Sequence, residues 1–538
     1  MENAYTLGGY RGDPSRRLGI VLSIEVALST ILRRLDCIEQ SIRRPEDTSS
    51  GLSNTIGDEF QCQSESEHID DYARGSVEPD AWLSASSISH SSNHHDSVKA
   101  LSDSSSPVSA LQHAADEVQR LAVQHDNSLM TAVDELHIDQ ESAKSWVKKL
   151  MPDIIGLPNV KLEASICVVY YCILYHGCFF HSQSTPFENN SETRTKLYQH
   201  CLRAVLAWEP CATGTTTDFV AAFFMVRVAA ERFDLELSWT MFRRACQYAE
   251  SIKLHRLDSS VDPALTGLDN AVLDAGRKGF WELINMDIYF HLIHDKPSAI
   301  VGTSHKAEVN LPWLDDSGLQ TETENITTLR FLIESRRSFI LMEFLQLLED
   351  AKVQPDPELI SKTEMLCGKI EALYEQWEIT EWVKKMIQSD GQLWTVAGLA
   401  MEGYTYIVSM LRHVISTTPG TVGTEPCDLR VSKLPLAIRA CRHILDIVGL
   451  LLNVMPFMGT VSVTFTVLQA HIPCAYLASN LLYSATPREY QADAVLIERV
   501  ARGLERISDG IADLAPLVAA IDNLNLMIHD RLRSHTPK

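Results

Sequence analysis

Apolar residues recur with a helical period along most of the chain. From residue 110 to residue 533 they return every three or four positions, and no alternating strand pattern persists beyond four or five residues. Good helix formers dominate these stretches and prolines fall between them. The pattern predicts helices over residues 111–124, 140–150, 162–178, 191–208, 219–234, 237–253, 271–294, 327–351, 358–385, 392–415, 432–455, 461–483, 490–514 and 517–532. We therefore expect an all-α, multi-helix domain over 110–533.

The most regular pattern lies in residues 18–44, where apolar positions alternate spacings of three and four over three heptads. This seam consists of Val21, Ile24, Leu28, Ile31, Leu35, Ile38 and Ile42. Three heptads suffice for a short coiled coil. An amphipathic helix that packs on the chain's own helical domain is the alternative reading, but the strict seam favours pairing with a second chain.

The segments on either side of the seam lack the apolar residues of a core. Residues 1–17 are polar and rich in glycine, and residues 45–109 are rich in Ser, Asp, Glu and His with few aromatics. Such segments cannot bury enough apolar area to offset the entropy of ordering the chain. We expect both to be disordered, and 45–109 to serve as a linker to the helical domain.

The charge of the chain bears on whether it binds nucleic acid by itself. The chain has 538 residues, with 47 Lys and Arg against 70 Asp and Glu, a formal net charge of −23. A nucleic-acid-binding domain carries a basic face that neutralises phosphates, and no segment here supplies one at scale. If the protein acts on DNA, a partner or a segment outside this sequence must read it.

A membrane location is not expected. The polar residues 1–17 contain no continuous apolar run of the kind a signal peptide needs. Residues 164–180 are apolar and uncharged, but His176 and Gly177 interrupt them and no basic cluster flanks them. A buried core helix explains this stretch as well as a membrane span does.

No motif for a catalytic, cofactor or metal site stands out. The sequence contains no glycine-rich phosphate loop, no HExxH and no GxSxG. Asp315-Asp316 follows an apolar stretch in an expected loop, and a site for Mg²⁺ and a diphosphate needs several carboxylates on facing helices. The cluster His90, His94 and His95 lacks Cys or carboxylate partners at ligand spacing. We expect no catalytic residue, no metal site and no cofactor in this chain.

The window 241–312 contains a series of polar and aromatic positions in a distinctive order. A helix ends in Leu-His-Arg, a second helix begins with basic residues and carries a Trp and a central Asp, and a Pro-containing turn and a Leu-Pro dipeptide follow. The positions are His255, Arg256, Arg277, Trp281, Asp287, Pro297, Leu311 and Pro312. This order resembles the middle homology region of fungal zinc-cluster (Zn2Cys6) transcription factors, and the seam resembles the dimerising segment of that family.

The zinc cluster of that family is missing from this sequence. A binuclear cluster needs six cysteines within about thirty residues. The first 160 residues hold only Cys37 and Cys62. Zinc is therefore expected only if a cluster precedes this sequence, encoded by a missing exon. Asp295-Lys296-Pro297 also stands where the family has Gly-Arg-Pro.

Several of the matched residues are expected to stabilise the fold. Trp281, with Phe280 and Leu283, should anchor a core helix. Arg277 and Lys278, near the start of that helix, should pair with acids such as Asp274 or Glu282, or with another helix. Asp287 lies in an apolar stretch and should be paired if it is buried, with Arg256 and Arg277 as candidate partners.

The resemblance implies a nuclear regulator of transcription by RNA polymerase II, specific for one pathway, such as a metabolite gene cluster. The seam would pair the chain with itself or with a related zinc-cluster factor, and the helical domain would restrain activity or sense a small-molecule effector. One alternative is an enzyme or ligand-binding protein of secondary metabolism on the same helical scaffold. Another is an adaptor that dimerises with a complete zinc-cluster factor.

Overall fold

The computed structural model describes residues 106–135, 164–180, 187–258, 270–300, 309–311, 322–354, 356–388, 390–417, 430–484, 486–508 and 512–534. Within these residues every regular element is helical and no strand occurs, which confirms the expected all-α fold. The expected disordered N-terminus, the seam of residues 18–44, the linker up to residue 105, the predicted helix 140–150 and Pro312 lie outside the described residues.

The described helices follow the predicted ones closely. They are α2 (Pro107–Glu135), α4 (Ala164–Phe180), α5 (Phe187–Trp208), α6 (Thr216–Glu231), α7 (Leu235–Ser251), α8 (Asn270–His294), α9 (Glu322–Val353), α10 (Leu359–Gln376), α11 (Ile379–Lys385), α12 (Asp390–Thr417), α14 (Pro435–Val454), α15 (Met458–Val461), α16 (His471–Tyr483), α17 (Gln491–Ser508) and α18 (Ala515–Ser534). Short 3-10 helices include η4 (Leu254–Arg256), and η8 (Ser462–Val467) is a π-helix.

Two predicted helices are interrupted by left-handed residues, and the predicted helix 490–514 contains α17 and the 3-10 helix η10 (Ala512–Leu514) on either side of residues that are not described. The stretch 358–385 forms α10 and α11, with Glu378 in a left-handed conformation between them (φ 50°). The stretch 461–483 passes from α15 through η8 to α16, with a second left-handed residue, Gln469 (φ 50°). Both residues are compatible with a helix by propensity, so the hydrophobic pattern does not signal either break.

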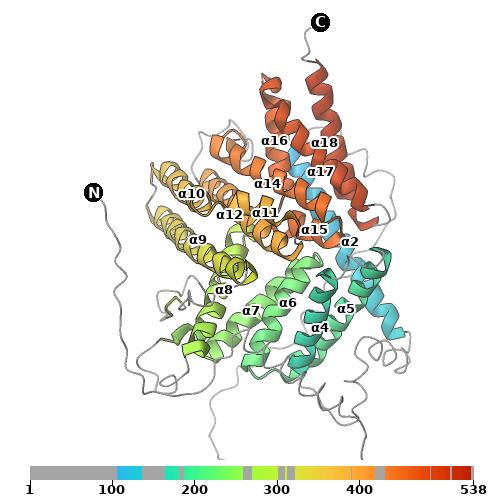
Figure 1. The fold of residues 1–538 in the computed structure, drawn as a ribbon, viewed down its shortest axis with the longest axis vertical. Helices are drawn as coiled ribbons and strands as arrows, with labels where there is room; N and C mark the ends of the chain where they lie inside the picture. The colour runs from blue at the N-terminus through green and yellow to red at the C-terminus, as the bar shows by residue number, and fades with distance from the viewer. Residues whose placement is uncertain are drawn as a thin grey trace, which may run out of the picture. The chain divides into compact units, whose positions relative to one another are not determined.

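Helices distant in sequence pack side by side. The helices α4 to α7 form one group of neighbours, while α8, α9, α10 and α12 pack on one another, and α12 also contacts α14 (Figure 1). The first described helix, α2, lies against α16 and α18 near the end of the chain. The Nε2 atom of His471 on α16 lies 2.8 Å from the Gln112 side-chain oxygen on α2.

The start of α6 is held by a dense set of hydrogen bonds. Thr215 and Asp218 form a capping box, in which each side chain accepts a hydrogen bond from the other's backbone N–H. Asp218 also accepts a hydrogen bond of 2.6 Å from the indole of the buried Trp208. This fixes the N-terminus of the helix that carries Arg227 and Glu231 to the candidate site.

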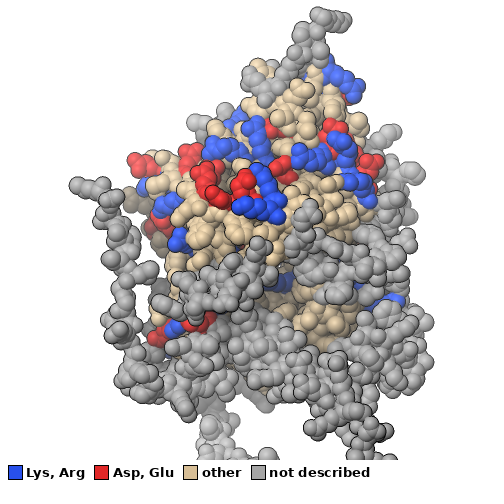
Figure 2. Space-filling view, in the orientation of Figure 1, with Lys and Arg blue, Asp and Glu red and all other residues tan. Residues whose placement is uncertain are grey.

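Charged side chains of both signs cover the outer face of α10, α14 and α17. In the part of this face that is described, Lys and Arg lie interspersed with Asp and Glu (Figure 2). Cross-helix pairs include Arg439–Glu371 at 3.0 Å and Arg499–Asp446 at 2.7 Å. Mixed charge of this kind is typical of a solvated surface and unlike the basic stripe that tracks a phosphate backbone.

None of the described helices, taken singly, has both the length and the apolar character needed to cross a membrane. The pair Met458–Val467 and His471–Tyr483, bent by 69°, meets those two criteria when the helices are taken together.

Two glycines of α12 are expected to respond oppositely to alanine. A Cβ at Gly398 would meet no atom within 4 Å, so Gly398→Ala should stabilise the helix by about 0.5–1 kcal/mol. A Cβ at Gly403 would collide with the ring of Tyr374, which is held by a 2.6 Å hydrogen bond to the Leu399 carbonyl. Gly403→Ala should therefore cost about 1–3 kcal/mol. Urea unfolding measures both, and equal effects would contradict the packing described.

Candidate functional site

A cavity of about 230 Å³ lies among α6, α8, α9, α12 and η8. Its walls combine apolar side chains with an unusual number of charged ones. Three ion pairs line it: Arg227–Glu282 at 2.9 Å, Arg330–Glu334 at 2.7 Å and Arg337–Glu402 at 2.7 Å. Charges inside a protein are rare unless they are paired or serve a function. We therefore take this cavity as the candidate functional site.

The innermost pair involves Arg337 of α9, whose side chain is 2% exposed. Its guanidinium donates hydrogen bonds to Glu402 and to the hydroxyl of Tyr374, the latter over 3.0 Å. Burial by itself lowers the pKa of Arg337, but the neighbouring Tyr374 and Glu402 outweigh it and raise the pKa well above its usual value. Arg337 therefore stays charged, and it ties α9 to α10 and α12.

Arg330 lies about two helical turns before Arg337 on α9 and points into the cavity. The negative charge of Glu334 is the main reason that its pKa is raised, and Glu402 and Glu282 add to the effect. Its side chain is nevertheless 34% exposed, because the space beside it is the cavity rather than packed protein. Its Nε donates to Glu334, which leaves both terminal nitrogens facing that space.

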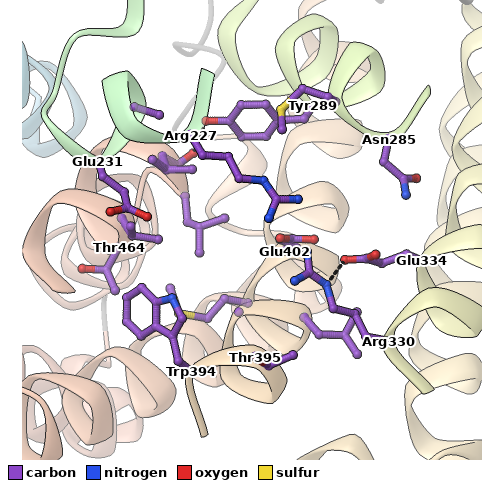
Figure 3. A pocket seen from close by; sticks show the side chains of 18 of the residues that line it. Arg227, Glu231, Asn285, Tyr289, Arg330, Glu334, Trp394, Thr395, Glu402 and Thr464 are labelled. Atoms are coloured by element: carbon purple, nitrogen blue, oxygen red, sulfur yellow. Dashed lines mark hydrogen bonds and ion pairs between the residues drawn. The ribbon is translucent and has the colours of Figure 1, made fainter. Parts of the chain in front are cut away.

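A second guanidinium, that of Arg227 on α6, reaches the same space from the opposite wall, and the Glu402 carboxylate lies between it and Arg330 (Figure 3). Arg227 uses one terminal nitrogen to bind Glu282 of α8, and its side chain is 42% exposed. Two arginines with spare donors thus face one acid across the cavity. The arrangement can bind a group of either charge directly.

The other side of the cavity carries Glu231, Thr464 and the indole of Trp394 (Figure 3). Oxygen Oε2 of Glu231 is buried without a hydrogen bond, and the nearest cation, a terminal nitrogen of Arg194, lies 3.5 Å away. Burial lowers the pKa of the adjacent His176, so this imidazole is neutral at pH 7 and adds no positive charge.

The apolar part of the wall comes from α8, α12 and η8. Tyr289 of α8 donates a 3.0 Å hydrogen bond to the Val467 carbonyl, which attaches η8 to α8. Burial raises the pKa of Tyr289 well above its usual value, so this hydroxyl stays protonated. Met286, Met401 and Val463 complete an apolar surface beside the charged groups.

The sequence motif residues cluster beside α8, but most of them serve structure. Arg277 binds Asp258 through two nitrogens and Asp274 over 2.6 Å. The hydrogen bond to Asp258 is the main reason that its pKa is raised. The expected pairing with Asp274 is therefore present, and Asp258, 19 residues earlier in the chain, is a partner that sequence spacing did not suggest.

Trp281 anchors the core as expected, and it also fixes the start of the Leu-Pro segment. Its side chain is 8% exposed, and its indole N–H donates a 3.1 Å hydrogen bond to the Asn310 carbonyl. The Asn310 N–H in turn donates to Asp258 over 2.6 Å. Leu311 itself is 47% exposed, and Pro312 lies outside the described residues.

Asp287 is buried, but its partners belong to a turn. It accepts hydrogen bonds from the Ser298 hydroxyl at 2.7 Å and from the backbone N–H groups of Ala299 and Ile300. Arg277, one of the two arginines expected beside it, contacts Asp258 and Asp274 instead. Asp287 thus stabilises the turn that follows α8.

The remaining motif positions lie at the surface or near it. His255 is half-buried in η4, where burial and then Arg256 lower its pKa. Arg256 and Pro297 are exposed. None of the motif positions that the structure describes contributes a side chain to the wall of the cavity.

Within the described part of the chain, no group of three or more His, Cys, Asp or Glu side chains is arranged to hold a metal ion. Burial raises the pKa of the thiols of Cys172, Cys441 and Cys474, which disfavours the reactive thiolate.

The sequence contains one indication of the cavity, and it lies outside the motif positions. Arg330, Glu334 and Arg337 stand four and three residues apart, on one face of a helix that also carries many apolar residues. Charges at that spacing on a helix that packs in a core point inward together. The remaining lining comes from residues that are 41 or more positions away in the sequence, and spacing cannot reveal that.

Comparison with known proteins adds no assignment. No protein-family model, no curated protein and no solved structure matches this chain.

Proposed function

We propose that this chain is the effector-sensing, regulatory part of a nuclear regulator of RNA polymerase II transcription. The observation that carries the proposal is the charged cavity inside a large all-α domain, because such a cavity can couple a small molecule to the packing of several helices. The order of motif positions from His255 to Pro312, which resembles zinc-cluster transcription factors, supports the same proposal.

In this proposal residues 18–44 pair the chain with a second copy or with a related factor. DNA is read by that partner or by a zinc cluster encoded ahead of this sequence. Ligand binding among α6, α8, α9 and α12 shifts the helical domain between an inhibitory and a permissive arrangement. The regulated genes form one pathway, such as a metabolite gene cluster.

An enzyme on the same scaffold is the second candidate, since the cavity combines an apolar wall with converging polar groups. The two candidates differ in what a deletion does to messenger RNA. We therefore propose measuring transcripts across the genome together with metabolites in a deletion strain of the source organism.

We expect the transcripts of a coherent gene set to rise or fall in the deletion strain, and the intact chain to restore them. A chain carrying Leu28→Asp and Leu35→Asp, which places charges in the seam, should not restore them. Unchanged transcripts together with one lost metabolite would contradict the regulator and favour the enzyme.

A further inference from the structure

We propose that the cavity binds a small zwitterion of the α-amino acid class with a short apolar side chain. This inference deepens the proposed function, because it names the chemical class of the effector. It depends on three properties of the cavity: its size, the balance of charges in its wall, and the unused bonding capacity of Arg227, Arg330 and Glu402.

The size of the cavity limits the part of a ligand that it can enclose. A dry cavity of about 150 Å³ in another protein accepts benzene. The present cavity of about 230 Å³ therefore has room for roughly ten non-hydrogen atoms. It is smaller than the sites that hold drug-sized ligands or nucleotides. A molecule of the size of leucine fits.

The charge balance argues against a ligand of one sign. Three arginines and four glutamates line the cavity, and Arg194 lies 3.5 Å from the fourth acid, Glu231. A ligand with only a negative charge would bind the guanidinium groups but would be repelled by Glu402 and Glu334. A ligand with only a positive charge would be repelled by Arg227 and Arg330. A ligand that carries both charges satisfies both signs and adds no net charge to the interior.

The carboxylate end of the ligand has suitable donors in Arg227 and Arg330. Each of these arginines binds its own glutamate and keeps further N–H groups directed into the cavity. Their guanidinium groups approach from opposite walls (Figure 3). Planar guanidinium groups with parallel N–H donors are the side chains best suited to a carboxylate.

The ammonium end has an acceptor in Glu402, which lies between the two guanidinium groups (Figure 3). Glu402 accepts from Arg337 through Oε2, and its side chain is 29% exposed to the cavity, so oxygen Oε1 can take a further donor. The apolar side chain would then lie toward Trp394, Met401 and Val463. The carboxylate, the ammonium group and the apolar side chain of an amino acid thus each have complementary groups in the wall of the cavity.

Binding to the purified full-length chain tests the proposal. L-leucine is the first probe, with L-valine and L-methionine beside it. Isoamylamine, which is leucine without its carboxylate, and isocaproate, which is leucine without its amine, serve as matched single-charge analogues. Calorimetry and the midpoint of thermal unfolding report binding.

We expect at least one of the amino acids to bind, and its single-charge analogues to bind roughly 10- to 100-fold more weakly, as the loss of a charged hydrogen-bond partner predicts. Arg330→Gln and Glu402→Gln should weaken binding by a similar factor. Arg439→Gln, which breaks an exposed ion pair outside the cavity, should not.

Filling the cavity provides an independent test. Gly398 lines the cavity and has open space beside its Cα, so Gly398→Leu should occupy the ligand's volume and abolish binding. Gly368→Leu on α10, where the space is also open but outside the cavity wall, is the matched control and should bind normally. The Gln variants and the wild-type analogue series keep the test valid if Gly398→Leu fails to fold.

Three results would overturn the proposal: no binding of any of the three amino acids at millimolar concentration, equal binding of an amino acid and a single-charge analogue, or normal binding by folded Gly398→Leu. Transcript profiles of a strain carrying Gly398→Leu separate this proposal from the proposed function. Binding that Gly398→Leu abolishes without any change in transcripts would leave the amino acid site standing and remove its regulatory role.

Discussion

Replacing Arg337 by alanine is expected to lower the free energy of unfolding of the helical domain by about 3–5 kcal/mol. The guanidinium is buried and joins three helices through Glu402, Tyr374 and the Leu399 carbonyl. Removal of the cation takes the buried donor away from the Glu402 carboxylate and the Tyr374 hydroxyl, and it opens a space beside α9. Unfolding by urea, followed by circular dichroism, measures the loss.

The adjacent residue Arg336 is the matched control for this substitution. It lies on the same helix and is exposed, with its guanidinium 5.8 Å from the centre of the Trp377 ring. Arg336→Ala should cost less than about 1 kcal/mol. If the two alanine variants were destabilised to the same extent, the buried network around Arg337 would not hold α9, α10 and α12 together as described.

Acidification should destabilise the protein through two buried histidines. Burial lowers the pKa of His294 and of His471 to about 4. Both are neutral in the folded chain at pH 5, whereas an exposed histidine in the unfolded chain takes up a proton below about pH 6.5. The unfolded state therefore binds more protons, and stability is lost as the pH falls from about 6.5 toward 4.

The expected loss between pH 7 and pH 5 is about 2 kcal/mol for each histidine. Urea unfolding at a series of pH values measures it. His294→Gln with His471→Gln should remove this part of the pH dependence, even though the double variant is less stable at pH 7 because His471 contacts Phe465 and Gln112. A pH dependence that is the same in wild type and double variant would contradict the assignment.

Local sequence determined the helices and the contacts within them. The apolar period placed the helices from α4 to α18, because a helix that packs on others must present an apolar face every three or four residues. It also placed Trp281 in the core and Arg277 beside Asp274, since residues three apart on a helix are neighbours whatever the rest of the chain does.

Only the tertiary structure decided the partners that are distant in sequence. Asp258 as the second partner of Arg277, the turn at Ser298 around Asp287, and the left-handed residue at Glu378 depend on where other segments pass. Helix propensity and residue spacing do not predict contacts between segments that are distant in sequence. Spacing therefore predicted the contact of Arg277 with Asp274 but not these contacts with distant segments.

The candidate site likewise combines a feature that the sequence predicts with one that depends on tertiary packing. The spacing of Arg330, Glu334 and Arg337 marks a charged stripe on one face of α9, and the sequence alone contains that stripe. The cavity exists only because α6, α8, α12 and η8 bring Arg227, Glu402 and an apolar wall to the same face. A cavity is a property of packing among distant segments, and only the folded chain brings these segments together.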